Sequence, residues 1–370
     1  MESRLGEARA RWLPAIETAM RRAITERAPL QGAPSPSADP PASHLAAGAP
    51  GHYGMMRYHL GWADERLDPA DAPTGKRLRP LIAILVAEAC GVPGVHALPI
   101  AVSLELLHNF TLVHDDIEDG DATRHHRPTL WALWGPPQAI NAGDGMHVLA
   151  HLALMDAIET RVFSAEVVLA LARRLAAASL VITEGQHLDL AFTGMDSVSV
   201  GAYLDMIARK SAALIACAAA MGAEAAHAPS AVVDSMQAFG HALGLGFQVR
   251  DDVLGMWGSP DVTGKPTSDL ARRKKTLPTL YALGRVSDAD RRGVNAFLDA
   301  GTNSSNAGSS ATDALEVAQA IIDRSGARRH CESLVARYSR EATGHLDVLP
   351  PSDARDALGE LVAMLEVRDR

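Results

Sequence analysis

The apolar positions of this chain recur at helical spacing and rarely alternate with the two-residue period of strands. In residues 2–28 the apolar positions at this spacing are Leu5, Ala8, Trp12, Ile16, Met20 and Ile24. Segments rich in Ala and Leu follow at 77–90, 97–116, 138–160, 165–192, 199–222 and 229–253. Shorter helical candidates lie at 278–285, 288–299, 312–324, 328–345 and 352–367. The pattern predicts an all-α fold, a large helical bundle.

Two breaks interrupt this pattern. Residues 29–50 are rich in Pro, Ala and Ser, a composition that buries too little surface to hold a fixed structure, so we expect a flexible linker. Residues 301–313 read as a surface loop or flexible insertion. Neither break isolates a second hydrophobic core. We therefore expect an N-terminal helix and linker over 1–50 and one all-α catalytic domain over 51–370.

The charge balance limits the classes of partner. A formal charge of −9 on 370 residues argues against general nucleic-acid binding, so an anionic ligand must be met by local basic residues. Cys90, Cys217 and Cys331 are far apart and form no CxxC pair, which favours a reducing compartment. The first residues alternate charges, and no apolar run reaches the roughly 18 residues that a transmembrane segment needs. We expect a cytoplasmic protein.

Two acidic clusters end apolar helices, "LVHDDIED" at 112–119 and "FQVRDDVLG" at 247–255. Asp115 and Asp119 are four residues apart, so a helix places both carboxylates on one face, while Asp116 points elsewhere. The C-terminal end of a helix disfavours anions, so capping does not explain them. A solvated acidic patch would explain either cluster alone, but their recurrence favours a hard cation. Mg²⁺ takes one or two carboxylates and leaves positions for phosphate oxygens, which predicts a phosphorylated ligand.

Basic residues occur where such a ligand needs them. In "GKRLRP" at 75–80, Lys76 and Arg79 are three residues apart, and we expect them on one face of a helix near its N-terminus. Lys210 lies in an apolar helical segment, either as a helix-edge lysine or as a buried ammonium that requires a partner. After the second acidic pair, 262–278 adds basic residues, which are also compatible with a surface loop: Lys265, Arg272, Arg273, Lys274 and Lys275.

In combination these segments resemble the trans-type polyprenyl diphosphate synthase family, in its short-chain, geranylgeranyl diphosphate synthase-like form. The resemblance covers most of 51–346. In order, the matching segments are "GKRLRP", "HDDIEDGDATRHHRP", "INAGD" at 140–144, "EGQHLDL" at 184–190, "RKSAALI" at 209–215, "FQVRDDVLG" and "GKPTSDLARRKKTLP" at 264–278. The resemblance implies the isoprenoid synthase fold around a central prenyl cavity. It also implies condensation of isopentenyl diphosphate with an allylic diphosphate, and a homodimer.

The resemblance assigns roles to single positions. It implies that Asp115, Asp119 and Asp251 bind Mg²⁺, expected as three ions that bridge the allylic diphosphate, with Asp116 and Asp252 as supporting carboxylates. The allylic diphosphate would contact Arg124, Lys210 and Lys265. Isopentenyl diphosphate would contact Lys76, Arg79 and His108. The cavity would be lined or ordered by Gln186, Asp189, Ser211 and Gln248, and Lys275 would support the second acidic site.

Two positions depart from the family pattern. The second motif ends in Gly255 where the family often has a third aspartate. His125 stands where the family usually has a second arginine that binds isopentenyl diphosphate, and it lacks the fork of an arginine. Arg127 could substitute only if the backbone turns it inward. The alternative is that both histidines simply face solvent. Two alternatives therefore stay open: a class I terpene cyclase that uses one prenyl diphosphate, and a non-catalytic partner subunit.

Product length is expected to depend on Phe110, five residues before Asp115 and so roughly 7.5 Å along the helix from the metal end. In the family a bulky residue there forms a floor for the growing chain. With Thr111 beside it, we expect geranylgeranyl diphosphate as the product, with farnesyl diphosphate next.

Overall fold

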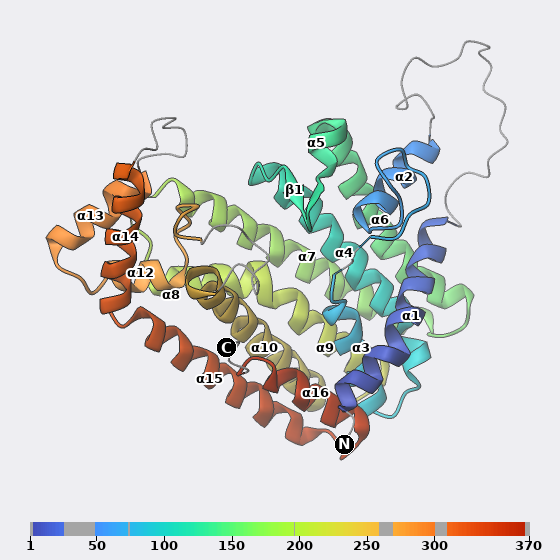
Figure 1. The fold of residues 1–370 in the computed structure, drawn as a ribbon. Coiled ribbons are helices and arrows are strands. Elements are labelled where there is room, and N and C mark those ends of the chain that lie inside the picture. The colour runs from blue at the N-terminus through green and yellow to red at the C-terminus, as the bar shows by residue number, and fades with distance from the viewer. Residues whose placement is uncertain are drawn as a thin grey trace, which may run out of the picture. The chain divides into compact units, whose positions relative to one another are not determined.

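The computed structural model describes residues 3–25, 49–72, 75–195, 197–258, 269–299 and 309–366. These residues are 78% helical and form almost no strand, which confirms the predicted all-α class (Figure 1). By their internal contacts they form two compact units. Unit 1 comprises Met1–Ala176, Ala218–Val233 and Pro351–Ala357, and unit 2 comprises Ala177–Cys217, Asp234–Pro350 and Leu358–Arg370. A single catalytic domain over 51–370 stays a prediction.

Unit 1 is organised around one buried helix, α4 (Leu98–Glu118), which contacts α1, α3 and α6. Because α4 is apolar on most of its circumference, burial on all sides is its stable state. The other elements of this part of the chain are α1 (Arg4–Thr25), α2 (Ala49–His59), α3 (Leu78–Ala89), η2 (Gly94–Ala97), β1 (Thr123–Arg124), β2 (Arg127–Pro128), α5 (Leu130–Trp134), α6 (Pro136–Glu159) and the first part of α7 (Ala165–Thr193).

The N-terminal helix α1 confirms the first periodicity of the sequence. Its buried residues are Leu5, Trp12, Ile16, Met20 and Ile24, five of the six positions that the period selects. Each fully buried side chain of this kind contributes about 1.5–3 kcal/mol. The helix lies along α3 and α4 (Figure 1), so it forms part of the core of unit 1.

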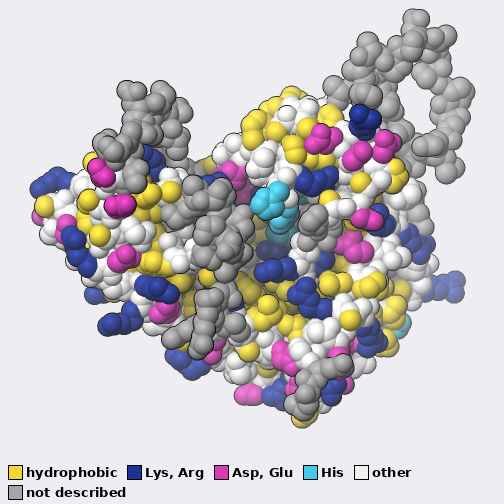
Figure 2. All heavy atoms as spheres, in the orientation of Figure 1, with side chains coloured by type: hydrophobic (Ala, Val, Ile, Leu, Met, Phe, Trp, Pro, Cys, Tyr) yellow, Lys and Arg dark blue, Asp and Glu magenta, His cyan; other side chains and the backbone are white. Residues whose placement is uncertain are grey.

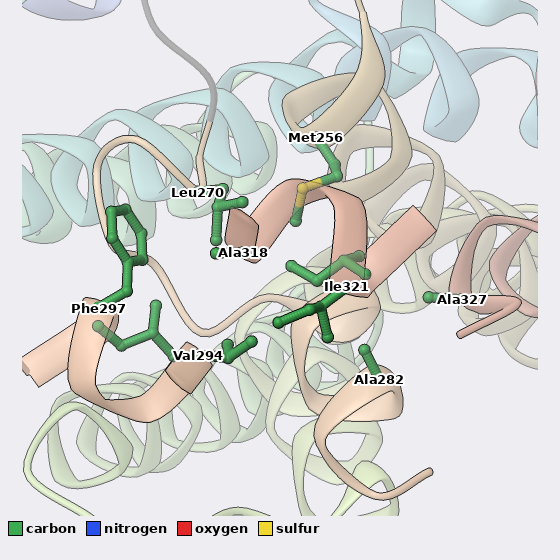
Figure 3. Packing of buried hydrophobic residues seen from close by; sticks show 10 residues of the cluster. Met256, Leu270, Ala282, Val294, Phe297, Ala318, Ile321 and Ala327 are labelled. Carbon is green, nitrogen blue, oxygen red and sulfur yellow. The ribbon is translucent and has the colours of Figure 1, made fainter. Parts of the chain in front are cut away.

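Unit 2 contains the second part of α7, then α8 (Val200–Ile207), a π-helical turn η3 (Ala208–Ala212), and most of α10 (Ser230–Trp257). It continues through α12 (Leu277–Leu283), α13 (Asp288–Asp299), α14 (Ser309–Arg324), α15 (Ala327–His345) and η4 (Leu346–Val348), while α9 (Ala213–Ala225) and α16 (Asp353–Ala363) contribute to both units. One of its hydrophobic clusters joins Met256, Leu270, Phe297 and Ile321 with their neighbours (Figure 3).

The structure corrects three expectations. Helix α2 was not predicted, and it begins at Ala49, inside the expected linker, whose residues 29–48 lie outside the described residues. Helix α14 begins at Ser309, so the last part of the expected loop 301–313 is helical. The segment 123–128 forms a hairpin between two short strands, in which Arg124 pairs with Arg127. Its turn residues His125 and His126 have φ of 50° and 63°, the left-handed values of a two-residue turn.

Within the part of the chain that the structure describes, two helical stretches, Gly94–Glu118 and Val200–Ala225, are long and apolar enough to cross a membrane by length and composition. Of the apolar windows concerned, 61% and 72% are buried inside the protein. Core helices pass the same test, so length and composition are weak indications of a membrane span here.

Candidate active site

The first acidic cluster is formed by the last turn of α4. The Asp119 backbone N–H donates to the Asp115 carbonyl at 2.8 Å, so helical geometry continues through Asp119 and keeps both side chains on one face, as predicted. Asp115 is half-buried and Asp119 is exposed. Asp116 points elsewhere, also as predicted, and is only 2% exposed.

Asp116 is paired with Arg124 of the hairpin. The Arg124 Nε and Nη2 atoms lie 2.8 and 2.7 Å from Asp116 Oδ1. Burial raises the pKa of Asp116 to about 6, although Arg124 acts in the opposite direction. The hairpin is anchored by Trp131, whose indole N–H donates to the Asp121 carbonyl at 2.9 Å. Arg124 is therefore held beside the acidic cluster by its own hairpin.

A basic cluster lies in the same unit, formed by Arg77, Arg79 and Arg124 with His59 and His108. Burial, followed by the charges of Arg79, Arg124 and Arg77, lowers the pKa of His108 well below its usual range. Burial, followed by Arg124 and Arg77, lowers the pKa of His59 to about 3. Both imidazoles are therefore neutral among arginines, a positive environment suited to an anion. Figure 2 shows histidine side chains beside Lys and Arg side chains on one face of the protein.

Sequence reasoning missed His59, because it ends the unpredicted helix α2 and no charge pattern marks it. The expected shared helix face of Lys76 and Arg79 is wrong. Arg77 adopts a left-handed conformation with φ of 50°, and α3 begins only at Leu78, so Lys76 lies exposed before the helix. Arg79 lies in the first turn of α3.

The hairpin fixes the places of the histidines and of Arg127 in "RHHRP". His125 and His126 are both exposed, at the turn of the hairpin. Arg127 donates to the carbonyls of Tyr58 at 3.0 Å and Ala63 at 2.7 Å, and its guanidinium lies 4.0 Å from the centre of the Tyr58 ring. These contacts hold Arg127 against α2 and the residues after it. Arg127 therefore does not take the place of the arginine that the family usually has at position 125.

In unit 2 a π-helical turn carries Lys210 and Ser211. Lys210 Nζ donates to Asp189 Oδ2 of α7 at 2.6 Å, so the lysine has the partner that its half-buried position requires. π-helical turns are rare and often mark functional positions. This one displays two of the predicted site residues on consecutive positions.

The second acidic pair is held by a chain of hydrogen bonds. Ser211 Oγ donates to Gln248 at 2.7 Å, and the Gln248 amide donates to Asp252 at 3.1 Å. Asp252 also accepts from the Tyr203 hydroxyl at 2.7 Å and from the Leu277 N–H at 3.2 Å. Burial raises the pKa of Asp252 to about 7 despite these donors. Asp252 is thus buried among hydrogen-bond donors, and the adjacent Asp251 is exposed.

The remaining predicted residues of unit 2 are less grouped. Gln186 lies half-buried on α7, one residue after Gly185. Lys275 Nζ donates to the Met195 carbonyl at 2.7 Å, a contact with the segment after α7. Lys265 lies outside the described residues.

Phe110 is buried in α4 against two histidines. Its ring stacks on His147 of α6 with centroids 4.8 Å apart, and it meets His114 edge to face at 4.7 Å. Thr111 donates its hydroxyl to the His108 carbonyl at 2.7 Å and so stays within its own helix. The predicted chain-length residue is therefore a fixed ring.

The carboxylates fit Mg²⁺ by their chemistry, since they offer hard oxygen ligands on one face of a helical turn. In the described part of the chain, no group of three or more His, Cys, Asp or Glu side chains is arranged to hold a metal ion. Mg²⁺ usually takes one or two carboxylates and completes its shell with water and phosphate oxygens. Asp115 and Asp119 in unit 1, and Asp251 in unit 2, are compatible with that kind of coordination.

Comparisons with known proteins agree on one family. The Polyprenyl synthetase family model matches residues 62–315. The chain is 42% identical over 285 residues to a (2E,6E)-farnesyl diphosphate synthase of Mycobacterium tuberculosis, which covers 77% of each chain. It is 44% identical over 236 residues to a geranylgeranyl diphosphate synthase of the same organism, which covers 64% of this chain and 66% of that one.

Solved structures give the same result. A polyprenyl synthetase from Streptomyces coelicolor superposes with a TM-score of 0.80 at 33% identity, over 98% of this chain and 99% of that one. A polyprenyl synthase from Caulobacter crescentus, complexed with calcium and isoprenyl diphosphate, gives 0.76 at 27% identity over 98% of each chain. The relatives are named as synthases, which favours chain elongation over the cyclase and the non-catalytic subunit. The chain belongs to the polyprenyl synthetase family, and it is a prenyltransferase, a short-chain trans-prenyl diphosphate synthase.

Proposed function

We propose that the protein condenses isopentenyl diphosphate with an allylic diphosphate and makes geranylgeranyl diphosphate as its main product, with farnesyl diphosphate as the second. The names of the relatives do not decide between these products, since one relative is named a farnesyl diphosphate synthase and another a geranylgeranyl diphosphate synthase. The position of Phe110 carries the proposal. Its ring lies one and a half turns before Asp115 and is held by His147 and His114, as a floor for the growing chain requires.

Mg²⁺ is the proposed cofactor, with Asp115 and Asp119 as ligands in unit 1 and Asp251 as a ligand in unit 2. When bound, it neutralises the diphosphate leaving group and stabilises the charge that develops as the allylic carbon–oxygen bond breaks. Three ions are proposed, as the family resemblance implies. The buried Asp116 and Asp252 support these ligands from within their helices.

The basic side chains hold the two substrates. We assign Arg79, His108 and Lys76 to isopentenyl diphosphate, and Arg124 and Lys210 to the allylic diphosphate. Lys and Arg N–H groups aimed at the diphosphate oxygens stabilise negative charge that grows in the transition state. The environment of His108 supports this assignment, since burial and then the charges of Arg79, Arg124 and Arg77 lower its pKa and hold the imidazole neutral among arginines.

The test is incubation with Mg²⁺ and farnesyl diphosphate, with and without isopentenyl diphosphate, followed by product analysis. We expect a C20 diphosphate only when isopentenyl diphosphate is present. Extension of a C10 starter that stops at C15 would refute the geranylgeranyl assignment. A hydrocarbon formed from farnesyl diphosphate alone would indicate a cyclase, and no turnover with any starter would indicate a non-catalytic subunit.

We also propose a homodimer that forms through α6. Four large apolar side chains of this helix are exposed within an arc of about 80°: Ile140, Val148, Met155 and Ile158. Exposed apolar stripes of this kind mark protein interfaces. In sedimentation experiments, the protein that carries Val148→Asp should be a monomer at concentrations where the wild type is a dimer. Val317→Asp on α14 is the matched control, since Val317 is 58% exposed and Val148 57%. A dimeric V148D would refute the α6 interface.

A cytoplasmic location is part of the proposal. Cys90 and Cys331 are free thiols, the state that a reducing compartment maintains.

A further inference from the structure

Arg77, in the middle of "GKRLRP", is a buried arginine that forms ion pairs with carboxylates of two helices. Its side chain is 4% exposed. Its Nε donates to Glu17 Oε1 of α1 at 2.7 Å, and its Nη1 donates to Glu105 Oε1 of α4 at 2.6 Å. Two carboxylates therefore hold one guanidinium in fixed positions.

The same arginine sets the local backbone. Its φ of 50° lies in the left-handed region, which a residue with a side chain rarely adopts. Because Arg77 interrupts the helical conformation, Lys76 precedes α3 and Arg79 lies in its first turn. A strained conformation persists only where surrounding contacts determine it, and the two carboxylate contacts of Arg77 are such contacts.

Glu17 is itself fixed. Its second oxygen, Oε2, accepts the indole N–H of Trp62 at 2.9 Å. On the other side, Glu105 accepts from the Asn109 amide at 3.2 Å. Glu17 belongs to α1, which precedes the matched family region of 62–315. The N-terminal helix thus reaches the basic segment through one side chain.

We propose that Glu17 is a positioning residue for diphosphate binding by Lys76 and Arg79, and that it acts through Arg77. The inference rests on the proposed binding of isopentenyl diphosphate by this segment. Arg77 donates two of its N–H groups to carboxylates, so its function is to fix the turn that presents its neighbours. Glu17 and Glu105 make that fixation possible.

The variant Glu17→Asp tests the role of geometry alone. Aspartate keeps the charge, so the field at the diphosphate is unchanged, but it is one methylene too short to reach both Arg77 and Trp62. Glu7→Asp is the matched control, because Glu7 lies on the same helix in an exposed pair with Arg4 at 2.9 Å. Titration calorimetry with isopentenyl diphosphate, without Mg²⁺ or allylic substrate, should show about tenfold weaker binding for E17D and wild-type binding for E7D.

Steady-state kinetics must then show a selective effect. The KM for isopentenyl diphosphate should rise about tenfold in E17D, while kcat and the KM for the allylic diphosphate stay within about twofold. An E17D protein that binds isopentenyl diphosphate as the wild type does, or that loses both substrates together, would overturn the inference. A wild type that does not bind isopentenyl diphosphate would overturn the proposed function of the segment as well.

A second variant tests the route through Arg77. Arg77→Lys keeps the charge but cannot donate to both carboxylates from a fixed fork. It should weaken isopentenyl diphosphate binding as E17D does. If the two residues act together, the double variant E17D/R77K should bind isopentenyl diphosphate at most about twofold more weakly than whichever single variant binds it less tightly. Additive losses would overturn the coupling between Glu17 and Arg77.

Discussion

Replacement of Gly185 by alanine should displace the turn that carries Lys210. Gly185 lies on α7 against the π-helical turn. A Cβ at this position would lie 2.7 Å from Lys210 Cα and 2.8 Å from the Arg209 carbonyl carbon, and closer still to Lys210 N. These are backbone atoms, which cannot rotate away as a side chain does. To reach the 3.4 Å of ordinary contact, Lys210 Cα must move by about 0.7 Å and the nearer Lys210 N by about 1 Å.

Two effects follow from that displacement. Overpacking of this kind costs about 1–3 kcal/mol of unfolding free energy. Lys210 donates to Asp189 at 2.6 Å, so a shift of this size lengthens that hydrogen bond and misplaces the ammonium. A misplacement of about 1 Å at a reacting site can cost on the order of 100-fold in rate. We expect kcat/KM for the allylic diphosphate to fall by about 10- to 100-fold in G185A.

Urea denaturation and steady-state kinetics measure the two effects. Gly344→Ala on α15 is the control, since a Cβ on Gly344 would have no heavy atom within 4 Å and the helix gains stability of about 0.4–1 kcal/mol from a smaller unfolded-state entropy. A G185A enzyme with wild-type unfolding free energy and wild-type kcat/KM would refute the close packing of α7 on the turn.

Three further predictions concern unit 1. Phe110→Ala should lengthen the prenyl product in product analysis, because it removes the ring stacked on His147; Phe163→Ala removes a ring of the same 9% exposure and should leave the product unchanged. The pKa of His59 is about 3 in the folded protein against an ordinary 6.5, so only the unfolded state gains the proton as pH falls below 6.5, and stability is lost. Urea denaturation measures the unfolding free energy that each protein loses between pH 7 and pH 5. This loss should be about 2 kcal/mol smaller for His59→Gln than for the wild type, while His187→Gln, at an exposed position, should lose as much as the wild type. Asp115→Asn should raise the Mg²⁺ concentration needed for half-maximal activity severalfold, and an unchanged Mg²⁺ dependence would remove Asp115 from the ligands.

Local patterns predicted what local forces determine. The helical period of residues 2–28 selected the buried face of α1, because one apolar stripe on a helix has one stable orientation. The four-residue spacing of Asp115 and Asp119 placed both on one face, because helical hydrogen bonding continues through Asp119. For "FQVRDDVLG" the pattern made no prediction of exposure, and the structure leaves Asp251 exposed and Asp252 buried.

Contacts between distant residues determined the rest. The left-handed conformation of Arg77 depends on Glu17 and Glu105, which are 60 and 28 positions away, and no pattern in "GKRLRP" contains that information. The spacing argument assumed a continuous helix there, so it misplaced Lys76. Burial, followed by the charges of Arg124 and Arg77, lowers the pKa of His59, and a local pattern shows neither cause.

The missing third aspartate of the second motif shows how a sequence count of acids can mislead. Gly255 is packed against Asp269, whose backbone N–H donates to the Gly255 carbonyl at 2.9 Å. A Cβ on Gly255 would lie 2.7 Å from the Asp269 carboxyl carbon, and nearer to one of its oxygens. Asp269 is buried, so its carboxylate has little room to move away. The position is therefore a glycine because a carboxylate from a later segment already occupies the space beside it. An aspartate at 255 would set two carboxylates against each other, with both the overlap and the like-charge repulsion working against the fold.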